Sequence, residues 1–357
     1  MKNIVIVRDY LSRGGGGCTA TLSLAQMLNN FHNLSLIFTY KDQVDEDLLL
    51  NQSTLYLCKK APVNRYIRFF LLYTRELFKL YKLLSSKRPD YVVCFGTTVQ
   101  TILTLCKFVL PFKLIVSERS DPGSLKSLSD RIRYKCYGYS DTIVFQTEGA
   151  MRYFNKKIQD KAVVIPNPIT IPQEKWDMNK TTESVVSVGR FEVVQKRQDL
   201  LLKAFKIILE SKPWVKLHFL GDGDDKQSMK DLAMQLGISD SVVFHGVVRN
   251  VKVELLKHRL FVLCSDYEGM PNALLEAMSL GMPVVSTNCR PGGASSLIDN
   301  QQNGLLTECG NSEQLANAIL YILDNPKTSE MMADCARSSL SRFDPRIIGS
   351  LWLKIFE

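Results

Sequence analysis

The sequence lacks the residue spacings that indicate a bound metal or a disulfide framework. Its 357 residues include four histidines and nine cysteines, but no CxxC pair and no zinc-ligand spacing. An odd number of irregularly spaced cysteines favours a reducing cytoplasm over a secreted, disulfide-bonded protein. We therefore expect no metal site and no metal cofactor.

Long apolar runs are also missing. The longest candidate, residues 101–116, is interrupted by Lys107, Pro111 and Lys113, whereas a membrane-spanning helix needs about 20 mostly apolar residues. The apolar start, residues 1–7, is too short for the core of a signal peptide and is predicted to be a first strand. These features predict a cytoplasmic protein.

Neither of two common phosphate-binding fingerprints is present. A glycine-rich segment, Arg13-Gly14-Gly15-Gly16-Gly17-Cys18, follows the first predicted strand, and the backbone amides of such a loop can approach a phosphate closely. The segment matches neither GxGxxG nor the GK[ST] end of a P-loop, which argues against a nicotinamide-dependent dehydrogenase. A plain flexible connection is the alternative interpretation.

The charge that the sequence does carry is uneven. Residues 1–168 have 24 Lys and Arg against 13 Asp and Glu, a net charge of +11, although the whole chain has a net charge of +9. The remaining residues are therefore close to neutral. A charge difference of this kind indicates an anionic partner for the first half.

Short apolar runs alternate with helical patterns along the whole chain. This alternation is typical of parallel sheets built from βαβ units, which bind ligands at the carboxyl ends of their strands. A segment with three prolines, residues 166–180, separates the two halves. We predict an α/β protein with two Rossmann-like domains, residues 1–168 and 169–344. The predicted strands are 3–7, 34–39, 91–95, 113–117, 142–145, 163–165, 184–188, 215–220, 242–244, 260–264, 283–286 and 304–306.

One segment of the second half, residues 266–278, combines a strand end, a Gly, a Pro and a helical pattern. Glu268 is expected in the loop ahead of the helix, where a carboxylate can accept hydrogen bonds from sugar hydroxyls. Glu276 is expected more than one turn inside the helix, where a carboxylate can hold a ribose diol. Two solvent-exposed charges at a helix end are the alternative, which the strand and turn context disfavours.

A second segment follows the first strand of the second half. It contains Gly189, which permits a tight turn, and two basic residues, Arg190 and Lys196. Arginine offers a bidentate fork for phosphate and lysine a compact charge, so the pair can neutralise a departing diphosphate. A solvated basic loop is the alternative interpretation.

Together these segments resemble family 4 of the glycosyltransferases, which have the GT-B fold, two Rossmann-like domains whose parallel sheets face a central cleft. The resemblance is strongest over residues 184–306, where Glu268 and Glu276 reproduce the E-x7-E signature of the family. The first half adds an element that looks like bacterial enzymes of O-antigen, capsule and related surface-glycan synthesis. It is Ser117-Glu118-Arg119-Ser120-Asp121-Pro122.

The resemblance implies a role for each matching residue. Arg190 and Lys196 would bind the donor diphosphate, Glu268 the transferred sugar and Glu276 the ribose, with Arg190, Lys196 and Glu268 as the catalytic group. Lys196 lies one position further from Arg190 than is usual in the family. The remaining implied donor residues are Gly15, Gly16, Gly269, Met270, Pro271 and Asn272, and those implied on the acceptor side are Glu118 and Arg119.

The resemblance also implies the reaction. A hexose or N-acetylhexosamine would be transferred with retention of configuration from a nucleotide-diphosphate sugar, with UDP favoured and no metal, to a glycan or lipid-linked glycan. The last helix, residues 345–357, would pack back on the first domain. Two alternatives stay open, a non-catalytic sugar-nucleotide-binding subunit and an epimerase or phosphorylase of the same fold.

Residues 64–88 form a basic, amphipathic pattern in which seven Lys and Arg residues alternate with aliphatic and aromatic ones. A basic amphipathic helix with many aromatics suits the surface of an anionic membrane. This predicts peripheral contact with the cytoplasmic face of the inner membrane. An ordinary packing helix with a solvated basic face is the alternative. No nucleic-acid-binding motif is present.

Overall fold

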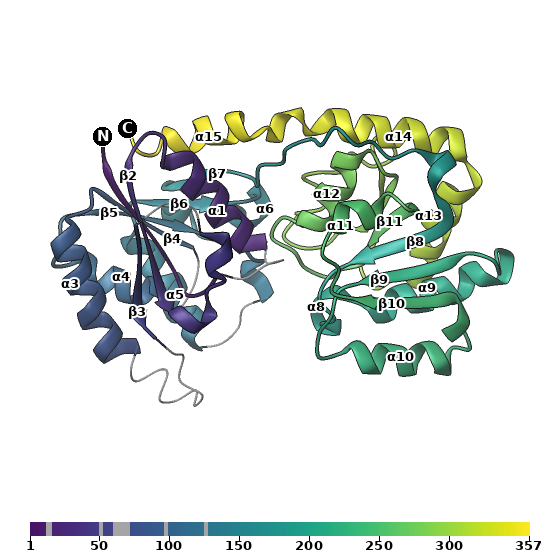
Figure 1. The fold of residues 1–357 in the computed structure, drawn as a ribbon, viewed down its shortest axis with the longest axis horizontal. Coiled ribbons are helices and arrows are strands. Elements are labelled where there is room, and N and C mark those ends of the chain that lie inside the picture. Colours follow the sequence, from purple (N-terminus) through teal and green to yellow (C-terminus); the bar gives the residue numbers. More distant parts are fainter. Residues whose placement is uncertain (12–15, 50–52, 60–71, 96–98, 125–127) are drawn as a thin grey trace. The chain divides into compact units, whose positions relative to one another are not determined.

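The computed structural model describes residues 1–11, 16–49, 53–59, 72–95, 99–124 and 128–357. The chain divides into two compact units. The first consists of Met1–Pro168 together with Arg346–Glu357, and the second of Ile169–Pro345. Each unit is built around one parallel sheet with helices packed against it (Figure 1).

The first unit contains a seven-stranded sheet in the order β3-β2-β1-β4-β5-β6-β7, with every pair parallel. Its strands are β1 (Asn3–Arg8), β2 (Asn33–Tyr40), β3 (Ser53–Cys58), β4 (Tyr91–Phe95), β5 (Lys113–Ser117), β6 (Thr142–Phe145) and β7 (Ala162–Val164). Its helices are α1 (Gly16–Leu28), the π-helical η3 (Leu72–Glu76), α3 (Leu77–Lys87), α4 (Val99–Lys107), α5 (Leu128–Cys136), α6 (Glu148–Arg152) and α7 (Lys156–Gln159), while α15 (Pro345–Leu353) starts at the end of the second unit.

The last residues of the chain belong to the core of the first unit. Trp352 and Phe356 are both buried. The Trp352 ring lies 6.4 Å from the ring of Phe95 at the end of β4, and Phe356 meets Tyr91 edge to face at 5.2 Å. Two large aromatic side chains therefore fix the chain end to β4 by burial of apolar area.

The second unit contains a six-stranded sheet in the order β10-β9-β8-β11-β12-β13, again with parallel pairs. Its strands are β8 (Thr182–Val188), β9 (Lys216–Leu220), β10 (Val242–Gly246), β11 (His258–Leu263), β12 (Val284–Thr287) and β13 (Leu305–Thr307). Its helices are α8 (Val193–Lys196), α9 (Gln198–Ser211), α10 (Lys226–Gln235), α11 (Val251–Leu255), α12 (Asn272–Leu280), α13 (Ser312–Asp324) and α14 (Pro326–Ser339).

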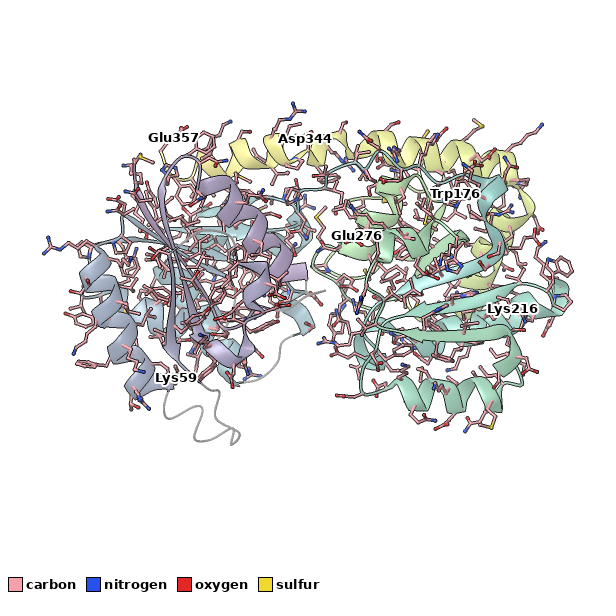
Figure 2. All side chains as sticks on the ribbon, in the orientation of Figure 1. Lys59, Trp176, Lys216, Glu276, Asp344 and Glu357 are labelled. Atoms are coloured by element: carbon pink, nitrogen blue, oxygen red, sulfur yellow. The ribbon has the colours of Figure 1, made fainter. Side chains whose placement is uncertain are left out.

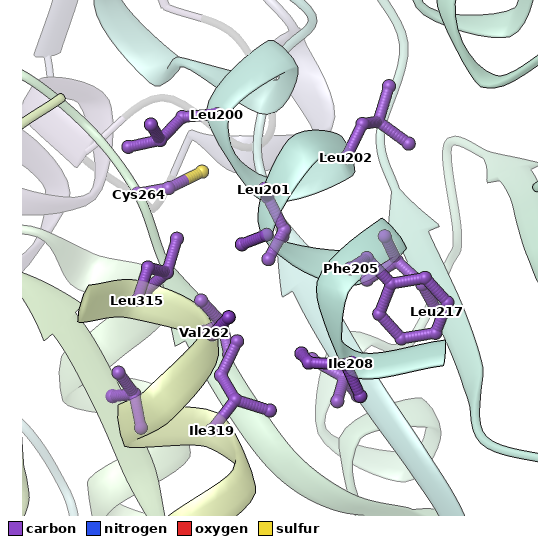
Figure 3. Close-up of a cluster of buried hydrophobic side chains, with 14 of the residues drawn as sticks. Leu200, Leu201, Leu202, Phe205, Ile208, Leu217, Val262, Cys264, Leu315 and Ile319 are labelled. Carbon is purple, nitrogen blue, oxygen red and sulfur yellow. The ribbon is translucent and has the colours of Figure 1, made fainter. Parts of the chain in front are cut away.

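The core of the second unit explains why its strands read as unbroken apolar runs. On one face of the sheet, Leu201, Phe205 and Ile208 of α9 and Leu315 and Ile319 of α13 meet strand residues such as Leu217 and Val262 (Figure 3). The α9 residues recur at helical spacing, so one stripe of the helix is buried. Because β11 is buried on both faces, alternation of polar and apolar residues disappears from it.

In both sheets the strand order reverses beside the first strand of the unit. The reversal lies between β1 and β4 in the first unit and between β8 and β11 in the second. In doubly wound folds, ligands bind outside the carboxyl ends of the strands at this position. The predicted α/β class and the pair of Rossmann-like units are thus confirmed.

Candidate active site

Three loops at the carboxyl ends of β8, β11 and β12 are joined by backbone hydrogen bonds. The amide of Asp266 donates to the carbonyl of Gln195 at 2.9 Å, and the amide of Glu268 donates to the carbonyl of Arg290 at 2.7 Å. These bonds connect the loop after β11 to both of its neighbours. The loop that carries Glu268 is therefore held from two sides.

Lys196 and Glu268 form the centre of this region. The Lys196 Nζ lies 2.5 Å from Glu268 Oε1, and the same oxygen accepts a hydrogen bond from Ser265 Oγ at 2.8 Å. Gln195 Nε2 approaches the second carboxylate oxygen at 3.4 Å. Glu268 is only 8% exposed, so the ion pair and the hydroxyl offset the cost of burying its charge.

Glycines allow the surrounding backbone to approach closely. A Cβ atom on Gly221, which has φ of +139°, would stand 2.0 Å from the carbonyl oxygen of Gly189. A Cβ atom on Gly293 would stand 2.3 Å from the carbonyl oxygen of Gly269. Only glycine fits such distances. The methylene groups of Lys196 lie over Gly189, where an added Cβ would be in ordinary contact at 3.8 Å.

Arg190 is placed differently from Lys196. Its side chain is 68% exposed and forms an ion pair with Glu192, two residues away, at 2.5 Å. Its backbone carbonyl accepts a hydrogen bond from Gln198. The structure therefore does not bring the Arg190 guanidinium together with Lys196 and Glu268, because Glu192 offers a carboxylate within easy reach.

Glu276, which is labelled in Figure 2, lies in α12. The helix follows Pro271, begins at Asn272 and ends at Leu280, and the next residue, Gly281, has a φ of +73° that is typical of a left-handed cap. The Glu276 carboxylate is half-buried, and burial raises its pKa although Lys252 opposes this shift. Among the described residues it has no ion-pair partner. Met270 is buried, and the carbonyl of Gly269 packs against Gly293.

Sequence reasoning missed three polar residues of this region: Gln195, Ser265 and Arg197. Arg197 has a left-handed backbone with φ of +50°, and its guanidinium bonds Asp266 at 2.8 Å and Asp199 at 3.0 Å. Asp199 and then Asp266 raise the Arg197 pKa further above its ordinary value. Sequence position could have identified two of them, because Ser265 directly precedes the predicted loop and Gln195 directly precedes Lys196.

The buried cysteines beside the site do not supply a nucleophile. Burial raises the pKa of Cys264 to about 12 and that of Cys289 to about 12. Because the thiolate is the reactive form of cysteine, both side chains stay protonated near neutral pH. Their role in this region is packing.

In the first unit, Glu118 is committed to internal hydrogen bonds. One carboxylate oxygen accepts from the backbone amides of Arg119 and Ser120 and from the Ser120 hydroxyl, at 2.9, 3.0 and 2.6 Å. The other accepts from Tyr137 at 2.5 Å and from Arg133 at 3.3 Å. The carboxylate is 2% exposed. It fixes the loop after β5.

Arg119 also lies in the loop after β5, at the carboxyl edge of the first sheet. Its NH1 donates to Asn167 Oδ1 at 3.0 Å, and its guanidinium carbon lies 5.3 Å from the centre of the Phe95 ring. Gly16 is the first residue of α1, and Gly15 lies outside the described residues. Of the two residues predicted on the acceptor side, Glu118 is therefore bonded internally, and Arg119 follows the carboxyl end of β5.

The basic amphipathic segment, residues 64–88, is described only from residue 72 onward. Leu80 and Leu84 of α3 are buried, and Lys79 Nζ donates to the carbonyl of Leu57 at 2.6 Å. One basic side chain is thus used inside the unit, while Phe78 is exposed. Across the described residues, no helix combines the length and apolar character needed to cross a bilayer.

Two Rossmann-like units in series, each built on a parallel sheet, are the architecture of the GT-B fold. Solved structures share this fold along the chain. The apo form of the lipopolysaccharide outer core galactosyltransferase WaaB aligns with a TM-score of 0.78 at 20% identity over 99% of both chains. HepE of Anabaena, in complex with UDP-glucose, aligns with a TM-score of 0.85 at 18% identity over 100% of this chain and 99% of that one.

The family model described as glycosyl transferases group 1 matches residues 169–339 of this chain. An uncharacterized glycosyltransferase of Haemophilus influenzae is 27% identical over 83% of this chain and 81% of its own. A Campylobacter jejuni protein is 26% identical over 96% of this chain and 94% of its own. It is named as an alpha-1,4-N-acetyl-D-galactosaminyltransferase of a diNAcBac-PP-undecaprenol-linked glycan. These matches confirm the predicted family resemblance.

Proposed function

We propose that this glycosyltransferase moves a hexose or N-acetylhexosamine from a UDP-sugar to a glycan or lipid-linked glycan during synthesis of a bacterial surface polysaccharide. The reaction retains the anomeric configuration and uses no metal. The enzyme works at the cytoplasmic face of the inner membrane. The observation that carries the proposal is the contact between Lys196 and Glu268 at the ligand-binding edge of the second sheet.

Lys196 neutralises charge on the leaving diphosphate. Its ammonium is held at the edge of the sheet by Glu268 and is 21% exposed, so phosphate oxygens can reach it. Fixed cations that face developing charge stabilise a transition state without reorganisation. Glu268 remains beside it and accepts hydrogen bonds from hydroxyls of the transferred sugar.

Arg190 completes the diphosphate site by changing partner. Its ion pair with Glu192 is exposed, and exposed pairs contribute only about 0–1 kcal/mol. A diphosphate offers bidentate, doubly charged contacts to a guanidinium. The arginine therefore leaves Glu192 when the donor binds. The two cations supply the charge that a metal supplies in other transferases.

Glu276 holds the ribose of the donor, since its carboxylate lies on α12 with no ion pair in the described part of the chain. The segment from Gly269 through Met270 and Pro271 to Asn272 lines the same donor site. The acceptor hydroxyl attacks on the face from which the diphosphate leaves, and a departing phosphate oxygen takes its proton.

Two relatives support the choice of substrates. HepE was solved in complex with UDP-glucose, which favours a UDP-sugar as the donor. The Campylobacter jejuni relative is named for a glycan linked to undecaprenol through a diphosphate, which favours a lipid-linked acceptor. Such an acceptor gives a purpose to the basic residues of the first half and to contact with an anionic membrane.

A thermal-shift screen over UDP-, GDP-, ADP- and dTDP-sugars tests the donor assignment, because a ligand that binds only the folded protein raises the melting temperature. We expect the largest rise with a UDP-sugar. Release of UDP that requires an added acceptor then separates transfer from epimerisation, phosphorolysis and simple binding. Failure of every nucleotide sugar to raise the melting temperature would contradict the proposal.

A further inference from the structure

Two arginines lie at the ligand-binding edge of the first sheet, and the donor assignment uses neither. Arg8 is the last residue of β1, and Arg119 follows β5 by two positions. Phe95, the last residue of β4, lies between their strands in the sheet order. The strand order reverses between β1 and β4, where parallel α/β folds bind their ligands.

Both guanidinium groups lie near the same aromatic ring. The Arg8 carbon Cζ is 5.9 Å from the centre of the Phe95 ring, and the Arg119 Cζ is 5.3 Å from it. Arg119 also approaches the Trp352 ring at 5.8 Å. Arg8 is held by Tyr10 and Thr21, to which its Nε and NH1 donate at 2.8 and 3.0 Å. The side chains are therefore fixed in place, and cation–π contacts offset part of their repulsion.

The positive charge of Arg119 feels the charge of Glu118 but has no directly paired carboxylate among the described residues. In the described part of the chain no carboxylate lies within ion-pair distance of it, and its buried Nε has no hydrogen-bond acceptor. The neighbouring Glu118 is occupied by Ser120, Tyr137 and Arg133. Burial first, and then the charge of Arg8, lower the pKa of Arg119 to about 9, although the charge of Glu118 opposes this shift. An anion between the arginines would relieve both effects.

We propose that Arg8 and Arg119 bind an oxyanion of the acceptor, either a phosphate or a sugar carboxylate. The proposal rests on the function proposed above, in which Lys196 and Arg190 hold the donor diphosphate, so this second cationic site serves the other substrate. A planar guanidinium matches either oxyanion through a bidentate contact. Asn167 Oδ1 accepts hydrogen bonds from both Arg119 and Gln146, and this contact orients the planar guanidinium of Arg119.

Calorimetric titration of the full chain with inorganic pyrophosphate and with glucuronate, each with saturating UDP, tests this site. UDP occupies the donor diphosphate site, so the titration reports a separate one. We expect at least one probe to bind, and the tighter probe identifies the oxyanion. R119Q should weaken that binding about 10-fold or more, because hydrogen bonds to charged groups are lost. R152Q is the matched control and should change nothing, since Arg152 is an exposed arginine of the same unit.

If the R119Q variant does not fold properly, its melting temperature will be lower than that of the unmodified protein. The R119K variant is then used instead, because lysine keeps the positive charge but lacks the two-pronged guanidinium. Displacement of the probes by UDP in the unmodified protein would overturn the proposal, because donor and oxyanion would share one site. Binding that R119Q and R119K leave unchanged would overturn it as well, as would binding of neither probe. Failure of UDP itself to bind would instead contradict the proposed function.

Discussion

Two glutamates that look alike in the sequence have opposite surroundings in the two units. Glu118 and Glu268 each stand just beyond a buried strand, and each has a basic partner. Glu118 is surrounded by fixed donors, among them two backbone amides and a buried tyrosine. Glu268 is bonded by a lysine, a serine and a glutamine, all of them side chains that can turn to a new partner. The number and mobility of the donors separate a structural carboxylate from one that can exchange its contacts with a substrate.

The largest effect is expected for Glu118→Gln. Burial acts to lower the pKa of Arg133, but the charge of Glu118 outweighs burial, so the pKa of Arg133 is raised. The pKa of Tyr137 is also raised, first by burial and then by the charge of Glu118. Removing the carboxylate charge takes from the mostly buried Arg133 its closest ion-pair partner and leaves it Asp130 at 4.0 Å, so we expect a loss of up to about 3–5 kcal/mol of stability. Urea unfolding measures the loss. Glu148→Gln is the control, because its exposed pair with Arg152 is worth about 0–1 kcal/mol. Equal stability of the Glu118 and Glu148 variants would contradict the structural role assigned to Glu118.

Lys196→Ala should reduce turnover in a protein that still folds, although loss of the ion pair with the mostly buried Glu268 should also lower its melting temperature. Loss of a fixed group that stabilises developing charge typically lowers kcat by about 100- to 1,000-fold. Steady-state kinetics with the donor found in the thermal-shift screen measure this. Lys206→Ala, which removes an exposed lysine of α9 in the same unit, should keep wild-type turnover. A Lys196 variant with normal kcat would remove the lysine from the proposed diphosphate site.

Arg190→Ala tests the second cation of the proposed diphosphate site. Arg190 must leave Glu192 before it can bind the diphosphate. We expect turnover to fall sharply, by about 10- to 100-fold, since the arginine stabilises the leaving group after it separates from Glu192. Arg249→Ala removes another exposed arginine of the same unit and serves as the control. Transfer near the wild-type rate by the Arg190 variant, with a verified donor, would refute its assignment.

Glu276 is expected to give the smallest effects. Glu276→Ala should weaken UDP binding about 10-fold through loss of charged hydrogen bonds to the ribose, whereas the exposed Glu330→Ala should not. Titration calorimetry of UDP measures the difference. Unchanged affinity in the Glu276 variant would place the ribose elsewhere.

The raised pKa of Glu276 gives a second, pH-dependent test. A carboxyl whose pKa is higher in the folded than in the unfolded state destabilises the fold above its folded pKa, and the penalty disappears below its unfolded pKa. Glu276→Gln, which mimics the protonated form, should therefore be more stable than wild type at neutral pH and equally stable in acid. A stability difference that does not change with pH would contradict burial as the cause of the shift.

Much of the fold was predictable because both sheets are parallel and buried on both faces. Apolar runs such as 91–95 and 113–117 coincide with β4 and β5. The edge strand β3, Ser53–Cys58, was not predicted, because its residues are mostly only partly buried and its polar residues interrupt the apolar pattern. Helix α9 starts at Gln198, two residues before its first leucine, Leu200, because the left-handed Arg197 directly precedes it.

The sequence indicated candidate site residues, but their geometry could not be predicted from it. The sequence placed Lys196 and Glu268 after two different strands of the second half, and the structure brings their side chains into contact. The outward position of Arg190 depends on Glu192, a local competition that no motif encodes. The internal role of Glu118 depends on Tyr137 and Arg133, which are distant in sequence and meet it only after α5 has packed.

The most direct test of the account is a crystal structure of the protein with UDP. We expect the diphosphate to contact Lys196 and a guanidinium of Arg190 that has left Glu192, with the ribose hydroxyls on Glu276. A nucleotide bound away from the carboxyl ends of β8 and β11, with Arg190 still paired to Glu192, would contradict it.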